Sequence, residues 1–168
     1  MQTGMRQGPE IWIRGPVTTT REPGPPGPAH THAATRRFSW VGTHGGAGVS
    51  TLAAVYGGHD SGRAWPGPDD PPSVLLVART HAAGLDTIAG AVEIFRRGQA
   101  PPGLDLDAVV LVADAPGRLP RPLAQRVKSL ESVIDVYRVP WVPAWRLGEL
   151  GRPPRETSAL VRLTGAAR

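Results

Sequence analysis

The chain has 168 residues, which suits one domain and leaves no room for a second sizeable core. It contains no cysteine, so disulfide bonds and thiolate metal sites are excluded. No apolar run is long enough to span a membrane, and the N-terminus carries no hydrophobic signal segment. A soluble, cytoplasmic protein without membrane attachment is therefore expected.

The charge is basic, with a net value of +5 and a pI of about 10.9. All but one of the 19 basic residues are arginine, the exception being Lys128. One interpretation is a nucleic-acid-binding protein that contacts phosphates, and the other is a solvated surface that is simply rich in arginine. The second is favoured because the arginines are scattered. The nearest approaches to clusters are Arg36 with Arg37, Arg96 with Arg97, and Arg118 with Arg121 and Arg126.

Residues 1–35 predict a disordered tail, because proline and glycine are dense there and apolar residues are few. Ile11, Trp12 and Ile13 form either a docking motif or incidental sequence. His30 and His32 are two potential metal ligands, but no carboxylate or third histidine accompanies them. We therefore expect no metal at this pair.

Residues 36–168 predict a single α/β domain. Short continuous apolar runs, as opposed to alternating ones, are typical of strands that are buried on both faces of a parallel sheet. Four such runs occur, at residues 38–42, 73–78, 108–113 and 133–139.

Helical patterns follow or separate these runs, at residues 50–55, 82–97, 122–130 and 157–163. The alternation predicts a three-layer α/β sandwich with a mostly parallel sheet of about four or five strands and right-handed crossovers. Residues 57–72 are polar and rich in glycine, proline and aspartate. They are predicted to be either a mobile lid or a simple loop.

The first strand leads into Thr-His-Gly-Gly-Ala-Gly-Val-Ser-Thr, which has the outline of a phosphate-binding loop between a strand and a helix. Gly45, Gly46 and Gly48 allow backbone N–H groups to curl around an anion. The N-terminus of the next helix adds its dipole and unpaired N–H groups. Ser50 and Thr51 stand at the helix start, where such loops place the hydroxyl that binds Mg²⁺.

This loop resembles the deviant Walker A sequence Lys-Gly-Gly-x-Gly-Lys-[Ser/Thr]-Thr of ParA/MinD-type ATPases, and the resemblance implies a truncated fold like that of the P-loop NTPases. His44 and Val49 stand where that family has its two lysines. The implied cofactor is ATP with Mg²⁺, and the implied metal-site residues are Ser50 and Asp114. The implied cofactor-binding residues are His44, Gly45, Gly46, Ala47, Gly48, Val49, Ser50 and Thr51.

Loss of a lysine contact weakens phosphate binding roughly ten- to a hundredfold, since a hydrogen bond to a charged group contributes about 1.5–3 kcal/mol. Loss of catalysis is expected to be larger. A protonated His44 replaces part of the missing charge. Arg79 or Arg118, at neighbouring strand ends, is the other candidate for the missing cation.

The resemblance extends to residues 73–85 and 107–117. The second segment matches either the Walker B strand, which makes Asp114 a ligand of metal-bound water, or a later strand that ends near the nucleotide base. Residues 136–148 resemble the closing strand of that family and favour the later strand. Under that match the middle of the family fold is missing. A third interpretation of Asp114 is a cap of the turn before Pro116 and Gly117.

Three further sets of residues carry two interpretations each. His81 is predicted to lie near a helix start and not to be a catalytic base. His59 and Asp60 form either a pair or a solvated turn, with the turn favoured. Trp141 and Trp145 either pack against the sheet edge, which is favoured, or face a partner or a base.

These patterns support three hypotheses of function. The first is a degenerate, non-hydrolysing ParA/MinD-like protein that acts as an adaptor for an unidentified protein partner, linked to mobile-element or plasmid maintenance. The second is an ATP-binding switch with weak or no ATPase activity. The third is a basic nucleic-acid-binding accessory protein. No nucleophile–base–acid arrangement is found, so no catalytic residue is assigned, and the oligomeric state stays open.

Overall fold

The computed structural model describes residues 36–167. The predicted tail, with Ile11, Trp12, Ile13, His30 and His32, lies outside the described residues. The described residues lie within the predicted domain of residues 36–168.

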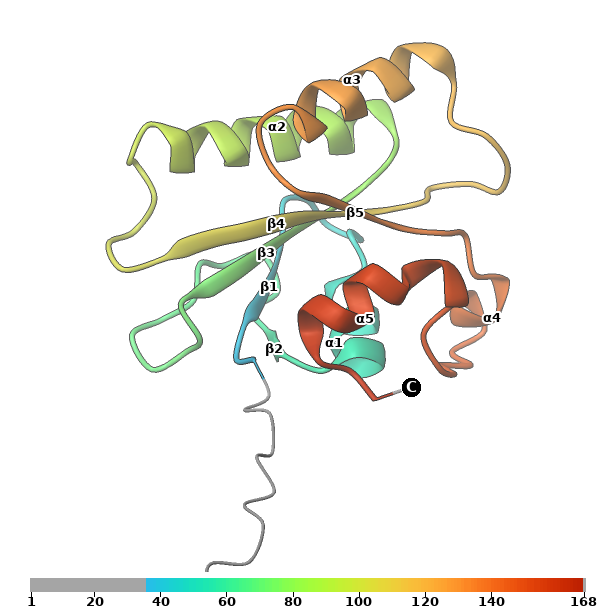
Figure 1. Cartoon of the computed structure of the whole chain (residues 1–168), viewed down its shortest axis with the longest axis horizontal. Coiled ribbons are helices and arrows are strands. Elements are labelled where there is room, and N and C mark those ends of the chain that lie inside the picture. The colour runs from blue at the N-terminus through green and yellow to red at the C-terminus, as the bar shows by residue number, and fades with distance from the viewer. Residues whose placement is uncertain (1–35, 168) are drawn as a thin grey trace, which may run out of the picture. The chain divides into compact units, whose positions relative to one another are not determined.

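A five-stranded sheet forms the middle layer (Figure 1), and its strands lie in the order β2-β1-β3-β4-β5. Every neighbouring pair of strands is parallel. The strands are β1 (Ser39–Gly42), β2 (His59–Asp60), β3 (Ser73–Arg79), β4 (Asp105–Val112) and β5 (Val136–Val139). The prediction of a parallel sheet with four or five strands is confirmed.

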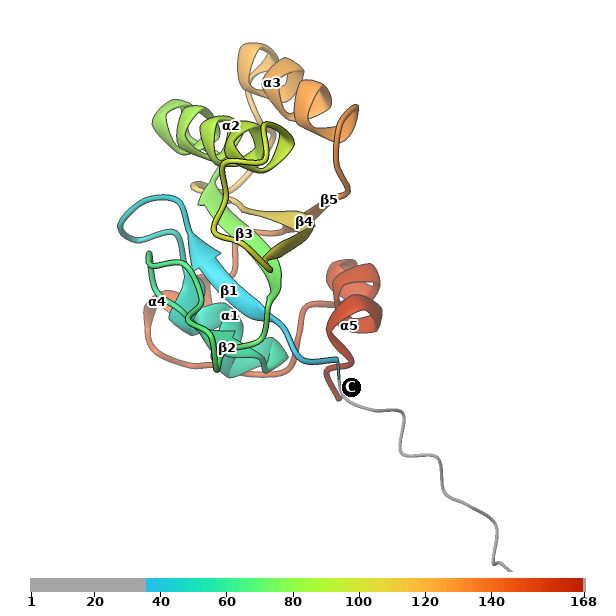
Figure 2. The same ribbon diagram turned by 90° about the vertical axis from the view of Figure 1, so that its left-hand side faces the viewer.

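Helices cover both faces of this sheet (Figure 2). Helices α2 (Ala82–Arg96) and α3 (Arg121–Glu131) lie on one face. Helices α1 (Val49–Tyr56) and α5 (Ser158–Thr164) lie on the other. Two short elements, α4 (Pro143–Arg146) and the 3-10 helix η1 (Arg155–Thr157), connect β5 to α5. The structure is thus the predicted three-layer α/β sandwich.

The central strands are buried on both faces, which explains their continuous apolar runs. Along β3, Leu75 and Val77 pack in the cluster beneath α1 and α5. Val74 and Leu76 pack in the cluster beneath α2 and α3. Because both faces are covered by helices, the alternation of a half-exposed strand is absent.

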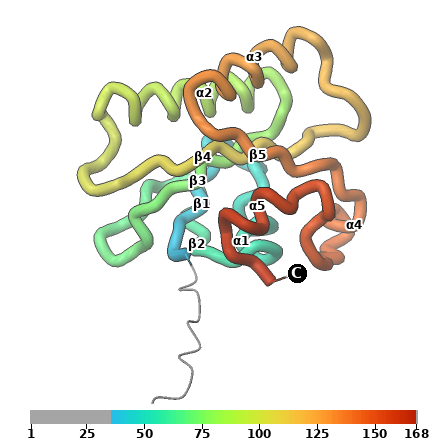
Figure 3. The backbone as a smooth tube through the Cα atoms, viewed as in Figure 1, coloured from blue at the N-terminus to red at the C-terminus, as the bar shows by residue number. Residues whose placement is uncertain are grey.

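The strand order fixes where a ligand site is expected. The chain leaves β1 toward α1 on one face and leaves β3 toward α2 on the other, although β1 and β3 are neighbours. In such sheets the crevice between these diverging connections, beyond the carboxyl ends of the strands, is the usual ligand site. Figure 3 shows the chain leaving β4 and β5 at the same edge of the sheet.

The polar connection at residues 57–72 differs from its prediction. His59 and Asp60 form the edge strand β2, which pairs with Ser39 and Trp40 of β1. The His59 Nε2 atom lies 3.3 Å from an oxygen of Asp70, so neither the His59–Asp60 pair nor the solvated turn is correct. Two-residue strands carry no detectable periodicity, which is why this one was missed.

Within residues 36–167, no helix combines the length and the apolar character needed to cross a membrane.

Candidate functional site

The loop between β1 and α1 depends on glycine at two positions. Gly46 has φ of 75° and Gly48 has φ of 105°, both in the left-handed region that other residues rarely adopt. Two bonds fix the base of this loop. The Gly42 N–H donates to the Gly62 carbonyl at 2.7 Å, and the Thr43 N–H donates to the Val77 carbonyl at 3.0 Å.

Backbone N–H groups around the loop are left without acceptors. The first bond of α1 runs from the Leu52 N–H to the Gly48 carbonyl at 3.0 Å. Among residues 36–167, no acceptor is found for the N–H groups of Gly45, Gly46, Gly48, Val49, Ser50 and Thr51. Unpaired donors at a helix start, together with the helix dipole, favour a bound anion.

A cavity of about 380 Å³ lies over these donors. It is lined by all eight residues predicted to bind the cofactor, and also by Gly42, Gly62, Arg63 and Arg79. The structure therefore brings the whole predicted loop together around one cavity. Arg63 was not predicted, because the bond from Gly42 to Gly62 that carries its segment to the loop cannot be seen in the sequence.

Arg79 brings a cation to the loop cavity. Its Nε donates to the Gly46 carbonyl at 3.2 Å, and its Nη1 donates to the Ala113 carbonyl at 3.0 Å. Its Nη2 lies 3.8 Å from the position that a Cβ atom on Gly48 would occupy. Of the two arginines considered from the sequence, Arg79 lines the loop cavity, whereas Arg118 lines a different one.

The charge of Arg79 is only partly compensated by its surroundings. Burial lowers its pKa, the carboxylate of Asp114 raises it, and the charge of Arg146 lowers it. Its two hydrogen-bond acceptors are neutral carbonyl groups. A partly buried guanidinium held by neutral partners gains favourable energy from an added anion.

His44 does not replace the missing lysine charge. Its Nε2 accepts a hydrogen bond from the backbone N–H of Arg79 at 2.9 Å, and its Nδ1 lies 2.8 Å from the Gly45 carbonyl. Because an amide N–H only donates, this Nε2 carries no proton. The prediction that a protonated His44 substitutes for the lysine is therefore wrong for this arrangement.

The predicted Mg²⁺ ligands are not brought together. Ser50 lines the loop cavity, whereas Asp114 lines the neighbouring cavity. No carboxylate lines the loop cavity, so its side-chain oxygens are hydroxyl groups alone. Hydrolysing P-loops hold Mg²⁺ with both a hydroxyl and a carboxylate. The residues at this loop therefore do not fit that metal site.

Asp114 also does not cap its turn. Its backbone N–H donates to the Thr80 hydroxyl at 3.1 Å, but we find no hydrogen bond to its carboxylate in the described part of the chain. The capping prediction is therefore wrong. The exposed carboxylate instead acts on Arg79 through its charge.

A second cavity of about 650 Å³ lies beside the first, beyond the carboxyl ends of β3, β4 and β5. Its apolar floor is formed by Leu111, Leu119, Leu123, Val127 and Val139. Its charged lining residues are Asp114, Arg118, Arg138 and Glu156. Ala113 also lines it, and the bond from Arg79 to the Ala113 carbonyl places that guanidinium between the two cavities. This cavity is assembled from the ends of three strands, the edge at which a ligand is expected in such a sheet.

His81 is the N-cap of α2, and its Nδ1 accepts a hydrogen bond from the Gly84 N–H at 2.9 Å. The prediction of a helix-start residue is confirmed.

Trp145 packs against the buried cluster on the α1 face, as favoured from the sequence. The Arg146 guanidinium lies 4.6 Å from the centre of the Trp141 ring, and this cation–π contact holds the Trp141 side chain against Arg146.

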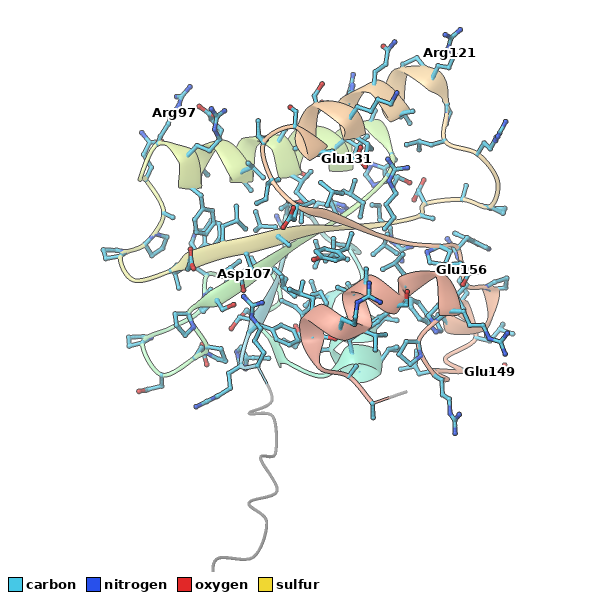
Figure 4. The ribbon with its side chains drawn as sticks, viewed as in Figure 1. Arg97, Asp107, Arg121, Glu131, Glu149 and Glu156 are labelled. Atoms are coloured by element: carbon cyan, nitrogen blue, oxygen red, sulfur yellow. The ribbon has the colours of Figure 1, made fainter. Side chains whose placement is uncertain are left out.

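The arginine groups singled out in the sequence were expected to be scattered, and several of them are paired with carboxylates. Arg96 and Arg97 both pair with Glu93, at 3.1 and 2.8 Å. Arg126 pairs with Asp86 at 2.7 Å. Figure 4 places Arg97 and Arg121 at opposite ends of the layer formed by α2 and α3.

Comparison with protein families matches residues 37–164 to the Family of unknown function DUF6668, and the chain belongs to this family. No curated protein matches the chain. No solved structure matches it either.

Proposed function

We propose that this member of the family binds a phosphorylated ligand of the nucleotide type at the loop of residues 44–51, without hydrolysing it. The observation that carries the proposal is the position of Arg79. Its guanidinium lies against the Gly46 carbonyl and lines the cavity that also contains the unpaired N–H groups of the helix start. A cation and a set of amide donors around one cavity are the chemistry that recognises phosphate.

The neighbouring cavity supports a ligand larger than phosphate. Its apolar floor suits a flat organic group, and the hydroxyl of Thr80 and the carboxylate of Asp114 offer polar contacts at its lining. Arg79 lies between the two cavities. We therefore infer that the phosphate occupies the loop cavity and the organic part of the same ligand occupies the neighbouring one.

Absence of hydrolysis is proposed from the residues that line the loop cavity. No carboxylate lies there to hold a metal ion or to orient water. Val49 occupies the position of the phosphate-gripping lysine, and its side chain is 7% exposed. Phosphoryl transfer depends on positive charge beside the transferring group. The cations that line this cavity are Arg79 and Arg63.

A ligand that is bound but not consumed suits a protein that reports ligand occupancy to a partner. This agrees with the non-hydrolysing adaptor expected from the resemblance of the loop to ParA/MinD-type sequences. The nucleic-acid alternative has less support, because Arg96, Arg97 and Arg126 are each paired with a carboxylate.

The test is a thermal-shift series with ATP, ADP and GTP, each with Mg²⁺ and with a chelator. At a hundredfold excess of ligand over Kd, binding adds about 2.7 kcal/mol to the free energy of unfolding and raises Tm by several degrees. We expect a shift that does not require Mg²⁺ and that is lost in Arg79→Gln.

The matched control is Arg162→Gln, because Arg162 is exposed on α5 and does not line either cavity. This control should keep the full shift. No shift of the wild type at millimolar nucleotide, or an equal shift in Arg79→Gln, would contradict the proposal.

A further inference from the structure

The imidazole of His44 joins the phosphate loop to the end of β3. Its Nε2 lies 2.9 Å from the backbone nitrogen of Arg79, and its Nδ1 lies 2.8 Å from the Gly45 carbonyl oxygen. Both ring nitrogens therefore have a backbone partner, one on each side of the site. No other side chain among residues 36–167 connects these two segments through both ends of one ring.

The two partners require one particular form of the ring. The Arg79 N–H is a donor, so Nε2 accepts, and the Gly45 carbonyl is an acceptor, so Nδ1 carries the proton. A neutral imidazole with its proton on Nδ1 satisfies both bonds. A protonated imidazole carries hydrogen on both nitrogens and places Nε2–H against the Arg79 N–H.

The bond to Gly45 orients the amide that the loop offers to an anion. The Gly45 carbonyl and the Gly46 N–H belong to one planar trans peptide and point in opposite directions. When the carbonyl faces the imidazole, the Gly46 N–H faces away from it. That N–H has no acceptor within the described chain, and Gly46 lines the loop cavity.

The hydrogen bond between His44 and the Arg79 N–H fixes the backbone of the arginine whose guanidinium reaches the loop. A Cβ atom on Gly84 would lie 2.3 Å from the Arg79 carbonyl oxygen and 3.1 Å from the His44 Nε2 atom. The first turn of α2 thus packs closely against the contact between His44 and the Arg79 backbone. His44 and the backbone of Arg79 therefore have little freedom to separate while α2 stays packed.

The titratable and charged groups around His44 come from the start of α2, from β3 and from the segment after β2, whose Arg63 lines the same cavity as His44. From α2, the His81 ring lies 5.0 Å away between centroids, and its Nδ1 accepts from the Gly84 N–H. From β3, Arg79 turns its guanidinium toward the carbonyls of Gly46 and Ala113. In residues 36–167 no carboxylate forms an ion pair with either ring.

We propose that uncharged His44 is a positioning residue that holds the Gly46 amide and Arg79 in their anion-binding arrangement, so that protonation of His44 weakens anion binding. This inference rests on the proposed function of the loop. Its sign is opposite to that expected for a histidine that substitutes for a lysine, because such a histidine would strengthen binding when charged.

The form of the ring is measured directly on the ligand-free wild-type protein. Long-range ¹H–¹⁵N NMR spectra at pH 8 distinguish a protonated from an unprotonated ring nitrogen. We expect the proton of His44 on Nδ1, with Nε2 unprotonated. A proton on Nε2 would overturn the inference, whether or not the protein binds phosphate.

The effect on binding is measured by calorimetry with pyrophosphate between pH 5.5 and 8, the range over which imidazoles ordinarily titrate. Every protein in the series carries His81→Asn, because asparagine retains the N-cap and removes the second imidazole. Affinities are compared with those of His44→Gln at each pH, so that protonation of the probe cancels. Glutamine offers an acceptor oxygen near the position of Nε2 and does not titrate.

At pH 8 we expect the pyrophosphate affinities of the protein with native His44 and of His44→Gln to agree within about threefold. At pH 5.5 the protein with native His44 should bind pyrophosphate about five- to tenfold more weakly than His44→Gln, which corresponds to the loss of about one hydrogen bond. His44→Lys, which restores the signature cation, should bind more weakly than the protein with native His44 at pH 8, because lysine cannot accept from the Arg79 N–H.

Three results would overturn the inference. They are tighter binding relative to His44→Gln at acid pH, a ratio that does not change with pH, and a gain of affinity in His44→Lys at pH 8. Absence of pyrophosphate binding in the wild type would instead overturn the proposed function and this inference with it. The two failures are therefore distinguishable.

Discussion

The two cavities at the carboxyl edge of the sheet differ in chemistry although Arg79, which lines the first, is bonded to Ala113, which lines the second. The loop cavity is formed by backbone N–H groups and arginine, with no carboxylate in its lining. The neighbouring cavity has an apolar floor and both acidic and basic residues in its lining. The first is suited to an anion, and the second is suited to an uncharged organic group.

The difference arises from the segments that connect each strand to its next helix. After β1, glycines precede α1, and the helix start leaves its N–H groups unpaired. After β4, the chain enters α3 through Pro120 and Pro122, which have no N–H to offer. Two helices that begin at the same edge of one sheet therefore do not provide equivalent sites, and the loop sequence decides which one leaves its N–H groups unpaired.

The largest expected effect comes from Gly48→Asp. The substitution forces a side chain into a left-handed conformation and places a carboxylate beside the helix start. Pyrophosphate binding should weaken by about a hundredfold or more, as measured by calorimetry.

The control for backbone strain is Gly165→Asp. Gly165 also has positive φ, at 71°, but ends α5 with open space around it. It should lose stability and keep its affinity for pyrophosphate. Retained affinity in Gly48→Asp would show that the loop is not the anion site.

A smaller effect is expected from Ala115→Trp, which places a large ring in the second cavity. The preference for a nucleotide over pyrophosphate should fall about tenfold, while the affinity for pyrophosphate itself stays unchanged. Ala159→Trp, at an exposed alanine of α5, is the matched control for adding an indole to the surface. Equal losses of affinity for the nucleotide and for pyrophosphate would show that the two cavities are not separate subsites.

Asp114→Asn should change pyrophosphate affinity by less than about threefold, because the exposed carboxylate acts on Arg79 only through its charge. Titrations with Mg²⁺ and with a chelator should agree for both proteins. A requirement for Mg²⁺ that disappears in Asp114→Asn would make Asp114 a metal-site residue after all.

The smallest effect concerns the scaffold beneath α1. The buried Tyr56 hydroxyl donates to the Thr157 hydroxyl at 2.7 Å. Tyr56→Phe should lower the free energy of unfolding by about 1 kcal/mol at pH 7, measured by denaturant titration, and should leave pyrophosphate affinity unchanged. A changed affinity would show that the scaffold and the site are not separable.

This residue also predicts a pH dependence. Burial raises the pKa of Tyr56 and the hydrogen bond with Thr157 lowers it, with burial the larger cause. A raised pKa in the folded state gives a contribution that is complete below about pH 10 and is lost as the pH rises through the folded value. Above about pH 10 the wild type should therefore lose stability more steeply than Tyr56→Phe, and parallel curves would contradict this.

Most of the fold was predictable because its signals are local. The apolar runs of β3 and β4 are long enough to identify buried strands, and α2 shows a clear helical period. Strand β2 and helix α4 were missed because elements of two and four residues contain no period. Their positions depend on distant pairing, such as that of Trp40 with Asp60.

The candidate site was predictable to a smaller degree. The glycine loop was found because its residues are contiguous, and Arg79 was one of two arginines considered. The role predicted for His44 does not fit its contacts, because its partner is a backbone N–H 35 residues away. Side-chain charge is visible in a sequence, whereas the hydrogen bond that determines the protonation of a histidine appears only in the folded chain.

The most direct test of the account is a backbone ¹H–¹⁵N NMR titration of the wild-type protein with pyrophosphate in the presence of a chelator. We expect the largest shifts at the N–H groups of Gly46, Gly48, Val49, Ser50 and Thr51, together with the Nε–H of Arg79. No shifts at these groups, or shifts confined to exposed arginines such as Arg97 and Arg121, would contradict the claim that this loop binds phosphate.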